Sequence, residues 1–172
     1  MEYKIGVIAD THENLPLIAK AVERFNKENV GMVLHAGDII APFTIKEFKN
    51  LKAKMYLVFG NNDGDKFLLR TKFKEIGEFY ETRYETEILG QKILVIHQPD
   101  FLEQLITSQR YDVIIYGHTH QVDIREEGKT LVINPGECGG WLSGKPTCAI
   151  LTLQGAPSGQ ALPERKVEII NL

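Results

Sequence analysis

The sequence predicts an α/β fold in which two mixed β-sheets pack face to face with helices on the outside, a four-layer α-β-β-α sandwich. In the first half of the chain, short apolar runs rich in β-branched residues alternate with segments of helical periodicity. Such β-α-β alternation is typical of parallel strands with helices packed against them. From Tyr80 onward, short runs separated by turn residues replace this alternation and indicate hairpins.

The first half of the chain supplies the predicted strand-helix units. Tyr3–Ala9 is an apolar run of the length and composition of a buried strand. Apolar residues then recur at helical spacing, which predicts a helix over residues 15–28, and Pro16 fits its first turn because an N–H is not needed there. The same criteria predict strands at Val30–His35 and Met55–Phe59 and helices at Pro42–Leu51 and Lys66–Ile76.

Hairpins dominate the predicted second half. Thr82–Leu89 alternates charged and apolar residues, Gly90-Gln91 fits a tight turn, and Lys92–His97 returns as an apolar run. Ala156–Leu162 is interpreted as a turn within the last hairpin, so that residues 1–172 are predicted to form a single domain. The remaining predicted elements are a helix at Phe101–Ser108 and strands at Val113–Tyr116, Val122–Arg125, Thr130–Ile133, Ala149–Leu153 and Val167–Ile170.

Composition excludes several classes of protein. The 172 residues include 20 Lys and Arg against 23 Asp and Glu, a net charge of −3, which argues against binding nucleic acid by neutralising phosphates. No run approaches the ~20 apolar residues that a membrane span requires, so no membrane partner is expected. The chain opens directly on a strand pattern without a signal peptide, and its two cysteines form no disulfide framework. These features predict a cytoplasmic protein.

Potential metal donors follow five consecutive predicted strands. Ligands bind beyond the C-terminal ends of parallel strands in α/β sheets, so donors at these positions are expected to converge. Glycines at 37, 60 and 117 allow the backbone to turn sharply beside them. The Asp and Asn motifs alone are more often ordinary turns, and His97 alone is more often a partly buried histidine with satisfied hydrogen bonds. Gly117-His118-Thr119-His120 is a stronger signal because its two imidazoles can face one cavity, and five motifs in order are hard to explain as independent turns. The polar residues concerned are Asp10, His12, Asp38, Asn61, Asp63, His97, His118 and His120.

This order of motifs resembles the calcineurin-like metallophosphoesterase superfamily. The short chain and Asn134-Pro135-Gly136 resemble its small bacterial and archaeal phosphodiesterase branch. The resemblance extends from Ile5 to about Gly136 and implies the two-sheet fold predicted above. It also implies two divalent metal ions per chain, one held by Asp10, His12 and His120, the other by Asn61, His97 and His118, with Asp38 bridging both.

The resemblance implies a metal-dependent phosphodiesterase acting on a small phosphodiester. Two ions would clamp the phosphoryl group, and a bridging hydroxide would attack phosphorus in line. Imidazole, carboxylate and amide donors without thiolate suit Mn²⁺, Fe²⁺, Zn²⁺ or Ni²⁺ better than Mg²⁺, and we expect Mn²⁺. Asn62 and Asp63 are the further candidate catalytic residues, contacting phosphate or orienting a ligand by hydrogen bonding.

Two departures from the family pattern favour an alternative function. Asn62 occupies the position at which many members carry a histidine that protonates the leaving group or contacts the phosphate. Loss of general acid catalysis lowers the rate about 10²–10⁴-fold when the leaving group is poor. His97-Gln98-Pro99 replaces the usual His-Gly-His. The alternative is a catalytically weak or inactive scaffold for protein interaction, as in the retromer subunit with this fold. The intact set of seven donors opposes it, because an unfilled polar cluster is costly.

A third candidate function and several further residues have interpretations of their own. A nuclease acting on DNA ends is disfavoured by the net charge of −3 and the short chain. His35 is interpreted as a packing residue or a support for a ligand, and Glu137 as a conceivable late proton donor. Gly139–Gly144 carries the single tryptophan and is either an aromatic lid over the core edge or a substrate rim or subunit contact. The sequence is compatible with a homodimer.

Overall fold

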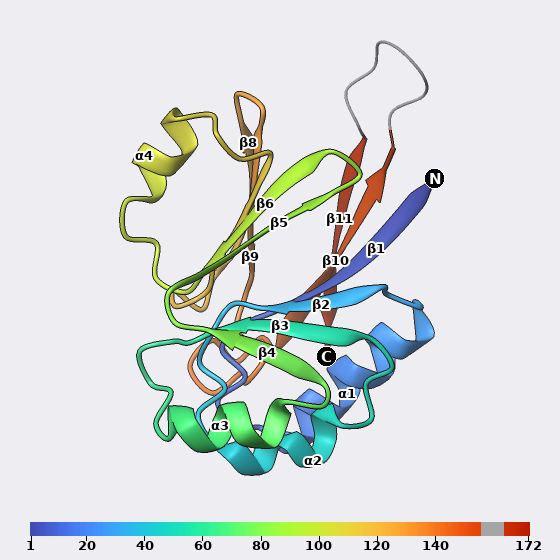
Figure 1. The fold of residues 1–172 in the computed structure, drawn as a ribbon, viewed down its shortest axis with the longest axis vertical. Coiled ribbons are helices and arrows are strands. Elements are labelled where there is room, and N and C mark those ends of the chain that lie inside the picture. The colour runs from blue at the N-terminus through green and yellow to red at the C-terminus, as the bar shows by residue number, and fades with distance from the viewer. Residues whose placement is uncertain (156–163) are drawn as a thin grey trace.

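Two mixed sheets make up the fold in the computed structural model, which describes residues 1–155 and 164–172 (Figure 1). The turn predicted at Ala156–Leu162 lies outside the described residues. The six-stranded sheet has the spatial order β11 (Arg165–Asn171), β10 (Thr147–Gln154), β1 (Glu2–Ile8), β2 (Met32–His35), β3 (Lys54–Val58) and β4 (Gly77–Tyr80). The five-stranded sheet has the order β5 (Arg83–Ile88), β6 (Gln91–Ile96), β7 (Val113–Ile115), β9 (Thr130–Pro135) and β8 (Val122–Glu127).

Helices lie on the outer faces of the two sheets. Beneath the six-stranded sheet in Figure 1 are α1 (Leu15–Lys27), α2 (Ile45–Phe48) and α3 (Lys66–Phe73), while α4 (Leu102–Thr107) lies beside the five-stranded sheet. The predicted four-layer arrangement of two mixed sheets with outer helices is therefore confirmed. None of the described helices is long and apolar enough to span a membrane.

Alternation along the strands divides the core into three layers. In β1, Ile5 and Val7 face the second sheet, whereas Ile8 faces the helices. In β7, Val113 and Ile115 fill the space between the sheets, and Ile114 packs toward α4. Each strand buried on both faces must be apolar throughout, which explains why these strands read as continuous apolar runs.

Strand direction brings the polar strand ends together. β1, β2, β3 and β4 run parallel, as do β6, β7 and β9. The two groups of carboxyl ends are joined across the sheets, because His97 Nδ1 lies 2.7 Å from the carbonyl oxygen of Ala36. Within the second sheet, the Gly117 N–H donates to the His97 carbonyl at 3.0 Å. The structure thus places the loops after β1, β2, β3, β6 and β7 at one site.

Two predicted helices differ from the observed ones, and one observed strand was not predicted. The predicted helix at Pro42–Leu51 is a 3₁₀ turn, Pro42–Thr44, followed by the four-residue α2. The predicted helix at Lys66–Ile76 ends at Phe73, and β4 follows as an edge strand paired only with β3. β4 went unpredicted because four residues are too few to show an alternating pattern, and its pairing with a distant strand supplies the missing stability.

Candidate metal centre

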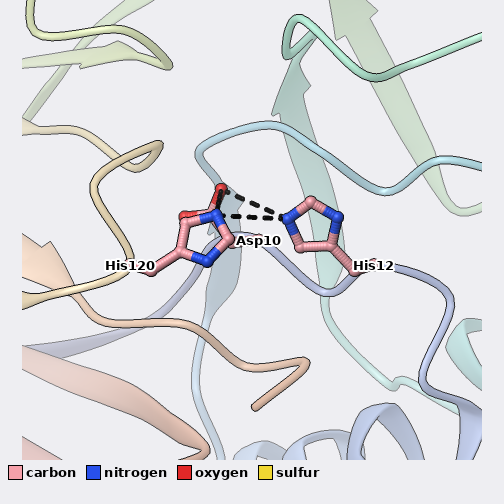
Figure 2. Close-up of side chains that lie close together, drawn as sticks. All are labelled: Asp10, His12 and His120. Carbon is pink, nitrogen blue, oxygen red and sulfur yellow. Dashed lines mark hydrogen bonds and ion pairs between the residues drawn. The ribbon is translucent and has the colours of Figure 1, made fainter. Parts of the chain in front are cut away.

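Asp10, His12 and His120 form the first convergent group of donors. Their rings and carboxylate point toward one another from the ends of β1 and β7 (Figure 2). The Nε2 atoms of His12 and His120 are 3.3 Å apart, and Asp10 Oδ1 lies 3.9 Å and 3.6 Å from them. Asp10 is fully buried, whereas the two imidazoles keep 19% and 15% of their surface exposed. Three donors within reach of one point could hold a metal ion.

A second group of donors lies directly beside the first. His97 Nε2 is 3.5 Å from Asp38 Oδ2 and 2.9 Å from Asn61 Oδ1. The same amide oxygen is 2.9 Å from His118 Nδ1. Asp38 Oδ2 is also 3.7 Å from His12 Nε2, so the Asp38 carboxylate lies between the two groups. Asn61 and His118 are exposed, which leaves this side of the centre open to solvent.

Strained backbone positions these side chains. Positive φ angles, which non-glycine residues rarely adopt, occur at five of the seven predicted ligands. Such strain persists only where the surrounding structure enforces it, and it clusters at functional sites. The five residues and their φ angles are Asp10 (50°), His12 (39°), Asp38 (60°), His118 (68°) and His120 (61°).

Two of the predicted glycines leave room for the donors. Gly37 has a φ of 91°, and a Cβ there would lie 2.5 Å from Nδ1 of His97. A Cβ at Gly60 would collide with the Asp38 carboxylate. Glycine is therefore required at both positions to let backbone approach a donor side chain closely.

Burial makes the centre electrostatically costly for anions. Desolvation, reinforced by the charge of Asp38, raises the pKa of Asp10 to about 8. Desolvation also lowers the pKa of His12 and of His97, which favours the neutral imidazoles that ligate metals. A cation at this position would remove the penalty on the carboxylates and accept the imidazole lone pairs.

The contacts of the two ring nitrogens of His97 indicate whether a cation fits the centre. The Ala36 carbonyl can only accept, so a neutral His97 carries its proton on Nδ1 and presents a lone pair on Nε2. That lone pair faces Asn61 Oδ1, which is also an acceptor, at 2.9 Å. Two acceptors at this separation repel unless a cation lies between or beside them. The donor set therefore fits a divalent metal ion.

Asp63 and Asn62 support the centre. The Asp63 carboxylate accepts from the N–H groups of Ile40 and Gly60, both at 2.7 Å, and so ties the loops after β2 and β3 together. Asn62 donates to Asp38 twice, through its backbone N–H at 2.9 Å and its side-chain Nδ2 at 2.7 Å. Asp63 thus connects two loops beside the donors, and Asn62 contacts the carboxylate that lies between the two groups of donors.

The structure assigns different surroundings to two other residues. His35 is fully buried; its Nε2 contacts Thr11 Oγ1 at 3.2 Å, and desolvation lowers its pKa to about 3. His35 therefore packs behind the centre, in agreement with its interpretation as a packing residue. The Glu137 carboxylate accepts several backbone N–H groups, which outweigh its burial and lower its pKa, so it is poorly suited to the proton donation considered above.

Sequence reasoning did not find the contact between Glu137 and His120. Glu137 Oε1 lies 3.4 Å from His120 Nδ1. A carboxylate facing the second ring nitrogen of a ligating histidine is a common arrangement at metal sites. The only sequence signal was the position of Glu137 directly after Asn134-Pro135-Gly136.

Two cavities flank the centre. One of about 550 Å³ borders His12 and His120 and reaches Trp141. The other, of about 740 Å³, borders Asn61 and His97. Both volumes are in the range of small-molecule sites.

A partly buried cluster of imidazole, carboxylate and amide donors in two adjacent groups, at the strand ends of a two-sheet sandwich, is typical of a metal-dependent phosphoesterase. The sequence model of the calcineurin-like phosphoesterase superfamily domain matches residues 3–156. The chain belongs to this superfamily, and the predicted resemblance is confirmed.

Individual relatives agree with this assignment. Phosphodiesterase MJ0936 of Methanocaldococcus jannaschii is 47% identical over 152 residues, which cover 86% of this chain and 92% of that protein. A solved structure described as a novel archaeal phosphodiesterase superposes with a TM-score of 0.81 at 42% identity, covering 96% of this chain and 99% of the other. Vacuolar protein sorting 29 from Cryptosporidium parvum has a TM-score of 0.69 at 20% identity over 99% of both chains, which shows a shared fold alone.

Proposed function

We propose that the chain is a dinuclear metal-dependent phosphodiesterase. One observation carries the proposal: seven donor side chains converge in two adjacent groups, with His12 Nε2 only 3.7 Å from the Asp38 carboxylate that lies between them. Asp10, His12 and His120 would hold one ion, Asn61, His97 and His118 the other, and Asp38 would contact both. Mn²⁺ is the proposed ion, with Ni²⁺, Fe²⁺ or Zn²⁺ as alternatives that the same donors accommodate.

Different residues of the chain would contribute to this reaction in different ways. When bound, two ions supply a hydroxide for in-line attack on phosphorus and positive charge for the phosphoryl oxygens. Asp63 accepts hydrogen bonds from the N–H groups of Ile40 and Gly60. These bonds connect the loop that carries Asp38 to the loop that carries Asn61. Asn61 contributes a neutral oxygen, so it adds no negative charge that would repel an anionic substrate.

A small diester with an acidic leaving group fits the open site best. Asn62 occupies the rim beside Asp38 and has no proton to transfer at neutral pH, so leaving groups that need protonation are disfavoured. The relative with 47% identity is named a phosphodiesterase, which supports diesters over monoesters. The exposure of Asn61 and His118 leaves room for a second ester group.

The alternative is a metal-binding scaffold with little turnover. Asn62 and the Gln98-Pro99 sequence after His97 favour it. Its prediction is specific: the chain would bind metal through the same donors and yet fail to hydrolyse even activated diesters.

Hydrolysis of bis-p-nitrophenyl phosphate and of p-nitrophenyl phosphate separates these functions. The protein would be stripped of metal, reloaded with Mn²⁺, Ni²⁺, Zn²⁺ or Mg²⁺, and measured beside Asp38→Ala. Glu23→Ala, which removes an exposed carboxylate from α1, is the matched control. We expect metal-dependent turnover that prefers the diester, disappears in Asp38→Ala and persists in Glu23→Ala. Two bound ions per chain without turnover would establish the scaffold instead.

A further inference from the structure

The Trp141 loop, Gly139–Gly144, carries the single tryptophan of the chain beside the metal centre. Trp141 is 65% exposed, yet its orientation is set from two sides. Its indole Nε1 donates to the His12 carbonyl at 3.0 Å, and its backbone N–H donates to Glu137 at 2.9 Å. A large aromatic ring that is exposed and held in one orientation is a preorganised binding surface.

Glu137 anchors both the loop and a predicted metal ligand. Its carboxylate is fully buried and accepts from the N–H groups of Leu142 at 3.1 Å and Ser143 at 2.7 Å, in addition to Trp141. The oxygen that accepts from Trp141 also lies 3.4 Å from His120 Nδ1. The same buried side chain therefore contacts both the loop and His120.

A cavity of about 550 Å³ is bordered by both the metal centre and the loop. His12 and His120 border it on the side of the metal centre, and Trp141 and Leu142 border it on the side of the loop. Leu142 is 81% exposed, so the loop offers an apolar surface that no part of the described chain covers. A phosphoryl group at the histidines would direct one ester group into this space.

We propose that Trp141, positioned by Glu137, binds a flat aromatic ester group of the substrate by stacking, while the phosphoryl group lies at the metal centre. The inference rests on the proposed function and adds the substrate class: diesters with at least one aryl or nucleoside component. Stacking of a base or an aryl ring on tryptophan is worth about tenfold in affinity, equivalent to about 1.4 kcal/mol. Glu137 is a positioning residue, since it touches the loop and His120 rather than the substrate.

Tryptophan emission tests this binding directly, because the chain has no other tryptophan. Metal-loaded protein would be titrated with phenyl phosphate, thymidine 5′-phosphate and methyl phosphate, which share a phosphate and differ in the ester group. We expect the two aromatic ligands to quench the emission saturably and to bind about tenfold more tightly than methyl phosphate. Quenching by phenyl phosphate and the nucleotide alike indicates general aromatic recognition, whereas quenching by the nucleotide alone indicates a nucleoside site.

The kinetics of substituted variants provide a second test of the stacking by Trp141. Trp141→Ala is expected to raise KM for bis-p-nitrophenyl phosphate about tenfold with a much smaller change in kcat, and Trp141→Phe to restore most of the loss. Phe67→Ala removes another exposed aromatic ring, on α3 and away from the cavity, and should leave KM unchanged. Glu137→Gln should shift the Trp141 emission of the ligand-free protein and weaken metal binding, because Gln keeps only one of the two oxygens that accept from the loop and presents no negative charge to His120.

The outcomes distinguish this inference from the proposed function. Aromatic phosphates that inhibit hydrolysis competitively without changing the emission would overturn the stacking role of Trp141 while leaving the phosphodiesterase intact. An unchanged KM in Trp141→Ala would do the same. Loss of the proposed function appears differently, as absence of metal-dependent hydrolysis in the unmodified protein.

Discussion

Replacing Asp10 by Asn is expected to stabilise the metal-free protein while removing its stabilisation by metal. Asp10 is fully buried, and burial together with the Asp38 charge raises its pKa to about 8. At pH 7 a carboxyl with so high a pKa costs folding up to about 4 kcal/mol relative to an exposed one. Asn carries no such penalty but keeps only part of the hydrogen bonding to the His118 N–H, so we expect a net gain of about 2 kcal/mol.

The pH dependence of this gain has a definite sign. A group whose pKa is higher in the folded state contributes its full stability below the unfolded pKa, near pH 4, and loses it as the pH rises through about 8. In chelator, the stability of the unmodified protein relative to Asp10→Asn should therefore fall between pH 4 and pH 8. The steepest slope expected is about 1.4 kcal/mol per pH unit.

Urea denaturation followed by far-ultraviolet circular dichroism measures both effects. Saturating Mn²⁺ at about 100 times its Kd should stabilise the unmodified protein by about 2.7 kcal/mol and the variant far less. Asp112→Asn is the control, since hydrogen bonds from Lys92 and Lys129 outweigh burial and lower the pKa of Asp112. That variant should lose stability. If metal-free Asp10→Asn is less stable than the unmodified protein across this pH range, the electrostatic reasoning is refuted.

Three further predictions concern other parts of the chain. Asn62→His should raise kcat for diesters with poor leaving groups by about 10–100-fold and change nitrophenyl diesters little, and an unaltered dependence on leaving-group pKa would count against a missing general acid. Gly60→Ala should weaken metal binding at least about tenfold in a calorimetric titration, because the new Cβ collides with Asp38, whereas Gly64→Ala has open space around it and should bind normally. Burial raises the pKa of Cys148 to about 12, so stability should fall above about pH 9 by up to about 1.4 kcal/mol per pH unit. Cys148→Ala should flatten that fall in urea denaturation, and equal slopes would show that the thiol does not titrate on unfolding.

Much of the centre could be predicted because its signals are local in sequence. A strand, a glycine and a donor follow one another within a few residues at Gly37-Asp38, Gly60-Asn61 and Gly117-His118. Parallel strands end at one edge of a sheet, so local order was enough to predict that the donors carried by the same sheet meet. The fold class followed from the same alternation of strands and helices.

Contacts between distant segments could not be predicted in this way. His97 and the Ala36 carbonyl meet because two separate sheets pack together, and no pattern near either residue indicates the other. The family pattern indicated only that Asn62 replaces a histidine that could donate a proton. The hydrogen bond from Asn62 to Asp38 depends on how the loops after β2 and β3 approach each other.

Which donors the chain carries, and at which strand ends they lie, is evident from the order of its residues. How those donors are supported depends on the folded protein, because the hydrogen-bond partners of a buried carboxylate come from segments that are distant in the sequence. Glu137 illustrates the difference. Nothing in its own segment distinguishes it from a proton donor, yet packing of the Trp141 loop and of His120 against it makes it the shared anchor of both.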